Sequence, residues 1–218
     1  MKLYHGTSER NLEKLLKDGL APRGEGITNW KEYPSRPDMV YLTQAYALYF
    51  AISASDTDTE RCLIMEIDTT KLNQTKFFPD EDFLAQEAGS LMMHEFFRDN
   101  IFDHKKRWKD SLLQLGNVAY RGKVHPYAFS RYCLFDAKVR PEIAMNALDP
   151  TISIMNYKFC GPKYRRLISW LFEDTDQLLC DYEIEGAKIR PDAERFLKIW
   201  EEEGKKRDGV EVVNLKEV

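Results

Sequence analysis

Short apolar runs of strand length recur along the chain, and they limit its fold more than any other feature. The clearest are Met39-Val40-Tyr41-Leu42 and the segment 62–67. Helical segments separate the runs irregularly, without the strand-helix alternation of a doubly wound sheet, so the pattern predicts an α+β fold. Further strands are expected at 2–4, 117–121, 131–135 and 211–215.

Capping residues mark where helices begin and end. Ser8 precedes a segment with leucines at helical spacing, and Gly19 follows it where a C-terminal glycine belongs. Thr43 is expected to cap the helix that follows the Met39–Leu42 run. The predicted helices span 8–18, 44–53, 79–97, 106–115, 163–172 and 192–203. The Gly- and Pro-rich segment 21–38 between them reads as a loop, and loops of this length are often functional.

Nothing in the composition divides the 218 residues, so one domain over 1–218 is expected. The four cysteines are scattered without a C-x-x-C pair, which argues against a structural zinc site and a disulfide framework. No segment reaches the roughly 18 apolar residues of a membrane helix. We therefore expect a cytoplasmic protein with no membrane partner.

Charge is unevenly distributed along the chain. The net charge of the whole is −4, but residues 101–140 alone carry +6. A positive middle segment in an acidic chain either attracts a phosphate-bearing ligand or forms a solvated helix face.

The common metal- and nucleotide-binding motifs are incomplete or absent. The segment His94-Glu95-Phe96-Phe97-Arg98 begins like a zinc-binding H-E-x-x-H helix, but Arg98 stands where the second histidine belongs. No G-x-G-x-x-G, Walker A or G-x-S-x-G sequence is present. The sequence therefore predicts no metal.

Two ordered segments carry the functional signal. The first is Leu3-Tyr4-His5-Gly6-Thr7-Ser8, followed by an N-L and a D-G-L sequence, and the second is Val40-Tyr41-Leu42-Thr43, followed by Ala47-Leu48-Tyr49. Together they resemble the ADP-ribosyltransferase superfamily, in its diphtheria-toxin and poly-ADP-ribose polymerase branch. RNA 2′-phosphotransferases and DNA-modifying bacterial toxins are relatives of that branch. The resemblance covers the first half of the chain and weakens after Ile67.

The resemblance implies a split, mixed β-sheet core over about 1–140 with flanking helices, and a helical C-terminal extension over about 141–218. It also implies NAD as co-substrate. His5 and Thr7 would contact a ribose, the Gly6 backbone the nicotinamide carboxamide, and Tyr41 and Tyr49 would hold the nicotinamide ring. Aromatic faces suit this cationic ring, because cation–π attraction contributes about 0.5–2 kcal/mol.

The late catalytic Glu of this family is missing. Asn117 occupies its region, with Gln114 as the nearest other polar candidate, and a neutral amide cannot act as a general base. Glu87 is the first candidate for a replacement. Alternatives are the carboxylates of Asp80-Glu81-Asp82, which also fit the ordinary preference for acids at a helix N-terminus. Arg121 is expected to hold a phosphate of NAD or of the acceptor.

Basic residues interleaved with aromatics favour a nucleic-acid acceptor, RNA over DNA, with a protein acceptor close behind. The predicted function is therefore NAD-dependent ADP-ribosyl transfer. Alternatives are mono-ADP-ribosylation of a protein, an RNA 2′-phosphotransferase using Arg121, Arg131 and His125, an NAD glycohydrolase, and a non-catalytic ADP-ribose-binding module. The resemblance extends to toxins of toxin–antitoxin and phage-defence systems, which implies an antitoxin partner, and to phage-encoded effectors. The basic residues are 105–107, 109, 121, 123 and 131, and a second group lies at 163, 165 and 166 beside aromatics at 157, 159, 164 and 170.

Overall fold

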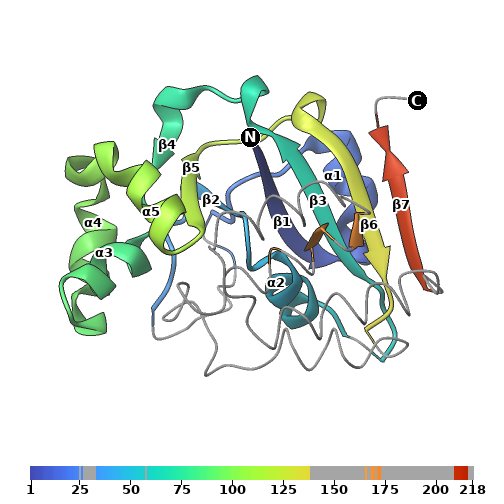
Figure 1. Cartoon of the computed structure of the whole chain (residues 1–218), viewed down its shortest axis with the longest axis horizontal. Coiled ribbons are helices and arrows are strands. Elements are labelled where there is room, and N and C mark those ends of the chain that lie inside the picture. The colour runs from blue at the N-terminus through green and yellow to red at the C-terminus, as the bar shows by residue number, and fades with distance from the viewer. Residues whose placement is uncertain are drawn as a thin grey trace, which may run out of the picture.

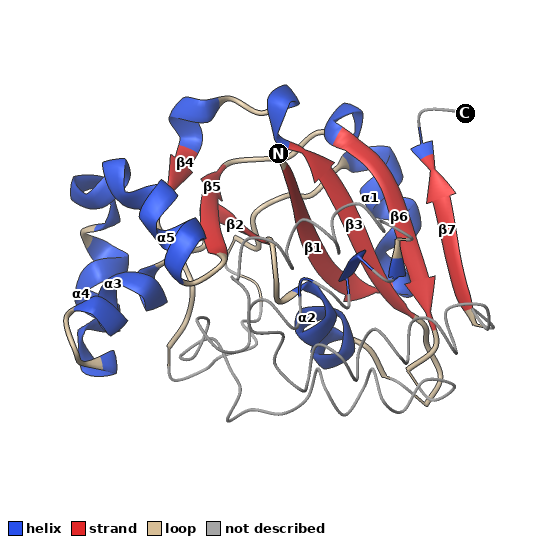
Figure 2. Cartoon of the chain, in the orientation of Figure 1, coloured by secondary structure: helices blue, strands red, loops and turns tan. Residues whose placement is uncertain are grey.

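One antiparallel sheet organises the protein. The computed structural model describes residues 1–24, 26, 33–56, 58–137, 165, 168–169, 171–172 and 209–215. Within these residues the strand order is β4-β5-β2-β1-β3-β6-β7 (Figures 1 and 2). The strands are β1 (Lys2–Ser8), β2 (Met39–Thr43), β3 (Cys62–Asp68), β4 (Phe77–Phe78), β5 (Asn117–Arg121), β6 (Phe129–Phe135) and β7 (Val210–Asn214).

The predicted α+β class is confirmed, but the expected mixed sheet is wrong. Each neighbouring pair among the described strands is antiparallel. β2, β3 and β4 run in the same direction, as do β5 and β6, but the sheet places at least one strand of opposite direction between any two of them. The connections between strands of like direction therefore lead to positions that are not neighbours, and no parallel pair forms among the described strands.

The sheet opens between β1 and β2. β1 pairs with β3 along its whole length, and β2 pairs with β5 along its whole length. In contrast, β1 and β2 meet at the single register pair Tyr4–Thr43. No other register pair joins these two strands, so the strand pairing is interrupted in the middle of the sheet. This interruption is called the strand gap below.

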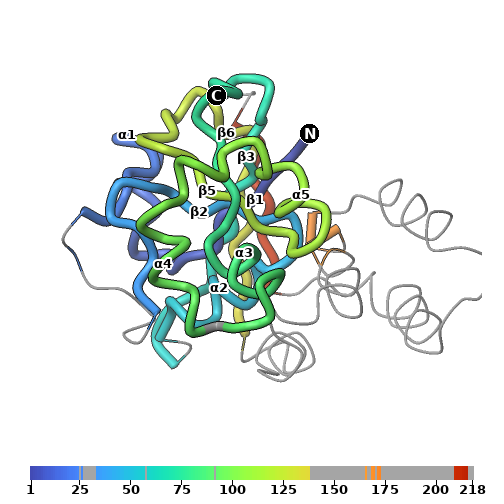
Figure 3. Tube along the Cα trace, turned by 90° about the vertical axis from the view of Figure 1, so that its left-hand side faces the viewer, coloured from blue at the N-terminus to red at the C-terminus, as the bar shows by residue number. Residues whose placement is uncertain are grey.

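Helices cover both faces of the sheet (Figures 1 and 3). Leu15 of α1 packs with Leu3, and on the other face Leu48 of α2 packs with Tyr4 and Ile64. The remaining helices gather beside β4 and β5 (Figure 1). The helices are α1 (Leu12–Asp18), α2 (Ala47–Ala54), α3 (Glu81–Glu87), α4 (His94–Asp99) and α5 (Trp108–Gln114).

Gly6 lets α2 lie directly on β1. A Cβ at Gly6 would stand 1.9 Å from the carbonyl oxygen of Ala47 and 2.6 Å from the nitrogen of Ala51. Both atoms belong to backbone, so no side-chain movement relieves the clash. The glycine therefore fixes the contact between helix and sheet, whatever else its backbone does.

Gly19 ends α1 as predicted, whereas Ser8 caps the 3₁₀ turn Glu9–Asn11 and Thr43 holds the turn before α2, whose N-cap residue is Tyr46. The Ser8 hydroxyl accepts from the Arg10 amide, and Thr43 Oγ1 accepts from the amides of Ala45 and Tyr46 ahead of α2. Gly19 has φ +83° at the end of α1. The amide of Gly19 closes the helix on the Leu15 carbonyl.

The continuous helix predicted over 79–97 is wrong. α3 ends at Glu87, and Gly89 then takes φ +73°, a conformation that breaks a helix. A 3₁₀ turn at Leu91–Met93 and the separate helix α4 follow. Half of the predicted helix 163–172 lies outside the described residues, as do all of 192–203 and most of the second basic group at 163, 165 and 166. Within the described residues, no helix has the length and apolar character needed to cross a bilayer.

Candidate functional site

His5 and Tyr41 stand on the two sides of the strand gap. His5 Nδ1 lies 3.2 Å from the Tyr41 carbonyl oxygen. A carbonyl only accepts hydrogen bonds, so Nδ1 carries the proton and Nε2 is left as an acceptor. The structure gives Nε2 no partner among the described residues. Burial lowers the pKa of His5, partly opposed by the Tyr41 carbonyl bond, so the imidazole is neutral near pH 7.

Strand alternation sends the two side chains to different faces. His5 pairs with Met65 and shares the face of Leu3, which α1 covers. Tyr41 pairs with Ala119 on β5, and its side chain lies on the other face of the sheet. The contact between them is therefore side chain to main chain, across the strand gap.

The Tyr41 hydroxyl is held by two hydrogen bonds. It donates to Glu81 Oε1 at 2.6 Å and accepts the Arg36 amide at 3.0 Å. Burial, followed by the charges of Glu81 and Asp80, raises the pKa of Tyr41 well above its ordinary value. The phenol therefore stays protonated and acts as a fixed donor to the carboxyl group.

Glu81 supplies the buried carboxyl that binds the Tyr41 hydroxyl. Its residue is 1% exposed, and its Oε2 has no hydrogen-bond partner among the described residues. Burial raises the pKa of Glu81 to about 7; the Tyr41 hydrogen bond opposes this and the charge of Asp82 adds to it. A buried carboxyl with a pKa near neutrality is typical of general acids and bases in active sites.

A short relay ties α3 to the start of β5 and so positions Glu81. The amide of Asp80 donates to Ser111 Oγ at 2.9 Å, and the Ser111 hydroxyl donates to the Asn117 carbonyl at 2.8 Å. The Asp80 side chain also caps α3 by accepting the Asp82 amide at 2.8 Å. Glu81 is therefore anchored next to the strand where the family resemblance places its late Glu.

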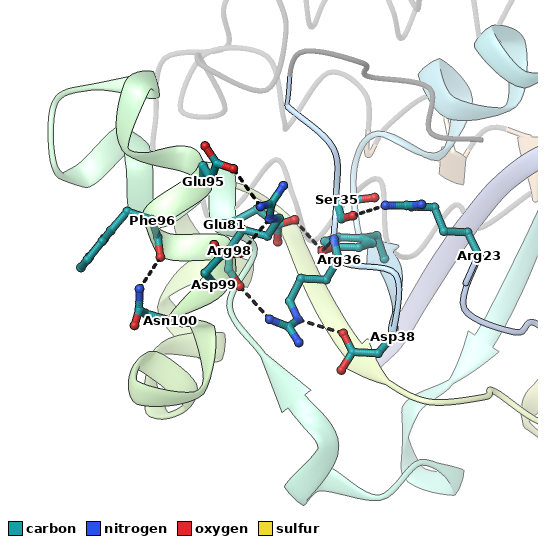
Figure 4. A network of polar contacts seen from close by, with 11 residues as sticks. Arg23, Ser35, Arg36, Asp38, Glu81, Glu95, Phe96, Arg98, Asp99 and Asn100 are labelled. Carbon is teal, nitrogen blue, oxygen red and sulfur yellow. Dashed lines mark hydrogen bonds and ion pairs between the residues drawn. The ribbon is translucent and has the colours of Figure 1, made fainter. Parts of the chain in front are cut away.

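Arg36, from the predicted functional loop, closes the other side of this cluster (Figure 4). Its guanidinium donates to Asp38 at 2.8 Å and to the Arg98 carbonyl at 2.9 Å. Figure 4 shows these contacts leading from Glu81 past Arg36 to Asp38. Arg36 and Ser111 were not predicted as site residues, because the contacts to the Arg98 carbonyl and to the Asp80 amide join segments distant in sequence.

Glu87 lies apart from this cluster. It is paired with Arg107 through both carboxylate oxygens. Six residues along the same helix correspond to about 9 Å of rise, and none of its described contacts reaches His5 or Tyr41. Of the carboxylates considered from sequence, the structure brings Glu81 to Tyr41.

The remaining predicted residues have defined neighbours. Asn117 is buried opposite Thr43 with its Oδ1 unpartnered among the described residues. Thr7 accepts the Asn11 side chain at 2.9 Å, so it supports the turn after β1. Tyr49 stands on α2 with its ring edge-on to Phe50, and no described contact joins it to Tyr41.

The described residues contain no group of three or more His, Cys, Asp or Glu side chains arranged to hold a metal. No protein-family model and no curated protein matches the chain. Among solved structures, EcPltA aligns with a TM-score of 0.37 and 11% identity, over 65% of this chain and 79% of EcPltA. A likeness this low does not establish a shared fold.

Proposed function

We propose that the protein is an NAD-dependent ADP-ribosyltransferase that modifies a nucleic acid, with RNA favoured over DNA. One observation carries the proposal. The buried Glu81 carboxyl, with a pKa of about 7, accepts a hydrogen bond from the Tyr41 hydroxyl. The main-chain carbonyl of the same tyrosine accepts a hydrogen bond from His5. The resemblance to the ADP-ribosyltransferase superfamily supplies the choice of donor.

The reaction makes modest demands on the protein. The bond between nicotinamide and ribose breaks, and its electron pair leaves on the nicotinamide nitrogen. A hydroxyl or amine of the acceptor then bonds to the ribose carbon, and its proton passes to the Glu81 carboxylate. With a pKa of about 7, Glu81 is about half ionised at neutral pH, where a general base is efficient.

Polar atoms around the strand gap suit the donor. His5 Nε2 is an acceptor for a ribose hydroxyl, and Asn117 Oδ1 and Glu81 Oε2 are buried without described partners. Buried polar atoms without partners are uncommon and carry a cost of about 1–3 kcal/mol each. Because His5 and Tyr41 lie on different faces of the sheet, a ligand rich in hydroxyl and amide groups would have to pass between β1 and β2 to satisfy all three.

The test is transfer from NAD labelled in its adenylate part to separate pools of RNA, DNA and protein. Release of nicotinamide together with label in RNA is expected. The His5→Ala variant should lose release while keeping the wild-type circular dichroism spectrum. Label in protein alone would reassign the acceptor, and NAD binding without any nicotinamide release would make the protein a non-catalytic module.

Two carboxylates on α3 allow a matched comparison. Glu81→Gln should lower nicotinamide release by at least about 100-fold, the usual contribution of a general base. Glu87→Gln alters a carboxylate of the same helix that contacts Arg107 instead. Loss of activity in Glu87→Gln with retention in Glu81→Gln would return the role to Glu87.

The structure gives the RNA 2′-phosphotransferase alternative less support. In that alternative Arg131 would bind the RNA phosphate, but its guanidinium donates two hydrogen bonds, of 2.7 and 2.9 Å, to the buried Glu66 carboxylate. His125 is exposed and stacked on Tyr127. A toxin or phage-effector role with an antitoxin partner, and a cytoplasmic location, rest on the family resemblance and the sequence.

A further inference from the structure

A basic hollow lies next to the candidate site, at the β4–β5 edge of the sheet. It has a volume of about 400 Å³ and is lined by Thr75, Lys76, Phe78, Lys105, Arg121 and Gly122. Three of these residues are cationic and none is acidic. Lys76, Lys105 and Arg121 come from three segments that are far apart in sequence. The fold therefore brings these charges together, and a local run of basic residues does not.

The cations of the hollow are only partly neutralised. Arg121 shares Asp38 with Arg36, with an Arg121–Asp38 separation of 3.5 Å. Within the described part of the chain, Lys76 and Lys105 have no acidic partner. Lys105 Nζ lies 5.3 Å from the centre of the Phe78 ring. This leaves a local excess of positive charge in a protein whose net charge is −4.

An exposed aromatic ring adjoins the cations. Phe102 is 39% exposed, and the guanidinium groups of Arg36 and Arg121 each lie 4.8 Å from its ring centre. Positive charge beside an accessible aromatic ring is the combination that binds single-stranded nucleic acid, through phosphates and base stacking.

Strand pairing places the hollow beside Tyr41. Tyr41, Ala119 and Phe78 form one row across β2, β5 and β4, because Tyr41 pairs with Ala119 and Ala119 with Phe78. Arg121 stands two residues further along β5, about 7 Å away, on the same face. A ligand in the hollow would therefore extend along the same face toward the Tyr41–Glu81 pair.

We propose that this hollow binds backbone phosphates of a single-stranded RNA and so holds the acceptor strand beside the transfer site. The open hollow with Lys76 and Arg121 exposed suits a strand that passes across it. The role of the strand as acceptor rests on the proposed function, whereas its binding does not.

The test measures binding of a fluorescent single-stranded RNA oligonucleotide by anisotropy, without NAD, at several salt concentrations. The double variant Lys76→Gln/Lys105→Gln removes two phosphate contacts. Each contact contributes about 0.7 to the slope of log K against log salt, so the slope should fall by about 1.4. At 0.1 M salt the affinity should fall roughly 20-fold.

A charge-matched control is available on α1. Lys14→Gln/Lys17→Gln removes two exposed cations from the opposite face of the sheet and should leave both affinity and slope unchanged. Lys76→Arg/Lys105→Arg should retain wild-type binding. Equal loss in the α1 control would show non-specific attraction and overturn the proposal.

A second arm separates RNA phosphate from the pyrophosphate of NAD. If the hollow held NAD, Lys76→Gln/Lys105→Gln would raise the KM for NAD and leave RNA affinity unchanged, which would overturn the proposal. The His5→Ala variant should bind RNA normally while releasing no nicotinamide. RNA binding through the hollow in a protein that never releases nicotinamide would support the hollow and refute the transferase.

Discussion

Replacing Glu81 with Gln should stabilise the protein at alkaline pH while removing its activity. In the folded chain, burial raises the pKa of Glu81 to about 7 from an ordinary value of 4.5. The fold therefore favours the protonated carboxyl. The resulting stability is fully present below pH 4.5 and is lost as pH rises through 7. A difference of 2.5 units corresponds to about 3 kcal/mol.

The variant cannot ionise at this position, so it escapes that loss. Between pH 5 and pH 8 the free energy of unfolding of the wild type should fall, relative to Glu81→Gln, by about 2–3 kcal/mol. Urea denaturation followed by tryptophan fluorescence at the two pH values measures it. The raised pKa of Asp82 affects both proteins, whereas the pKa of Asp80 is raised in part by the charge of Glu81, so the difference measures Glu81 together with its effect on Asp80.

Glu87→Gln is the control, because Glu87 is partly exposed and ion-paired with Arg107. It should show no comparable pH-dependent difference from the wild type. A Glu81→Gln variant that is less stable than the wild type by the same amount at both pH values would contradict the raised pKa of Glu81. That result would mean that Glu81 is an ordinary structural carboxylate whose hydrogen bond to Tyr41 stabilises the fold at every pH.

Two further substitutions test how the site is positioned. Gly6→Ala should destabilise the protein by at least about 3 kcal/mol or prevent folding, because the new Cβ would stand 1.9 Å from a backbone atom of α2. Thermal denaturation measures this loss, and a wild-type melting temperature would contradict the contact between α2 and β1. Ser111→Ala removes the hydrogen bonds that link Asp80 to Asn117, and the free energy of unfolding from urea denaturation should fall by about 1–3 kcal/mol. The variant should also release nicotinamide more slowly, and unchanged release would mean that the link does not position Glu81.

Local signals predicted the elements but not their pairing. Gly19 ends α1, and Ser8 and Thr43 hold the turns just before α1 and α2; all three positions could be predicted from sequence because these contacts act over two to four residues. β4 was missed because it is only Phe77–Phe78, a strand defined by its pairing with β5 and by no pattern of its own. The break in the predicted helix 79–97 lies at Gly89, whose positive φ a reading based on periodicity overlooks.

The residues of the candidate site also divide into those that local sequence predicts and those that it does not. His5 and Tyr41 could be proposed from an ordered motif, since each is set in a strand with a clear local signature. Glu81 was only one of several carboxylates, because an acid in the first turn of a helix needs no functional explanation. What sets Glu81 apart is its position, which is held by the Asp80–Ser111–Asn117 link between residues more than thirty positions apart in sequence. Local sequence patterns cannot predict such a contact.

The position of Glu81 bears on the kind of transfer to expect. A carboxylate at the start of β5 would belong to the sheet, whereas Glu81 belongs to a seven-residue helix joined to β5 through one serine. Its pKa near 7 also makes its charge dependent on ligand, since an acceptor that displaces water or a cation that approaches it shifts its ionisation. Proton transfer at this site should therefore respond to acceptor binding. Under the proposed function, bound RNA displaces water and adds negative charge beside Glu81, and both raise the pKa of its carboxyl. The pH profile of nicotinamide release should therefore move to higher pH when RNA is added, and a profile identical with and without RNA would argue that Glu81 does not face the reacting groups.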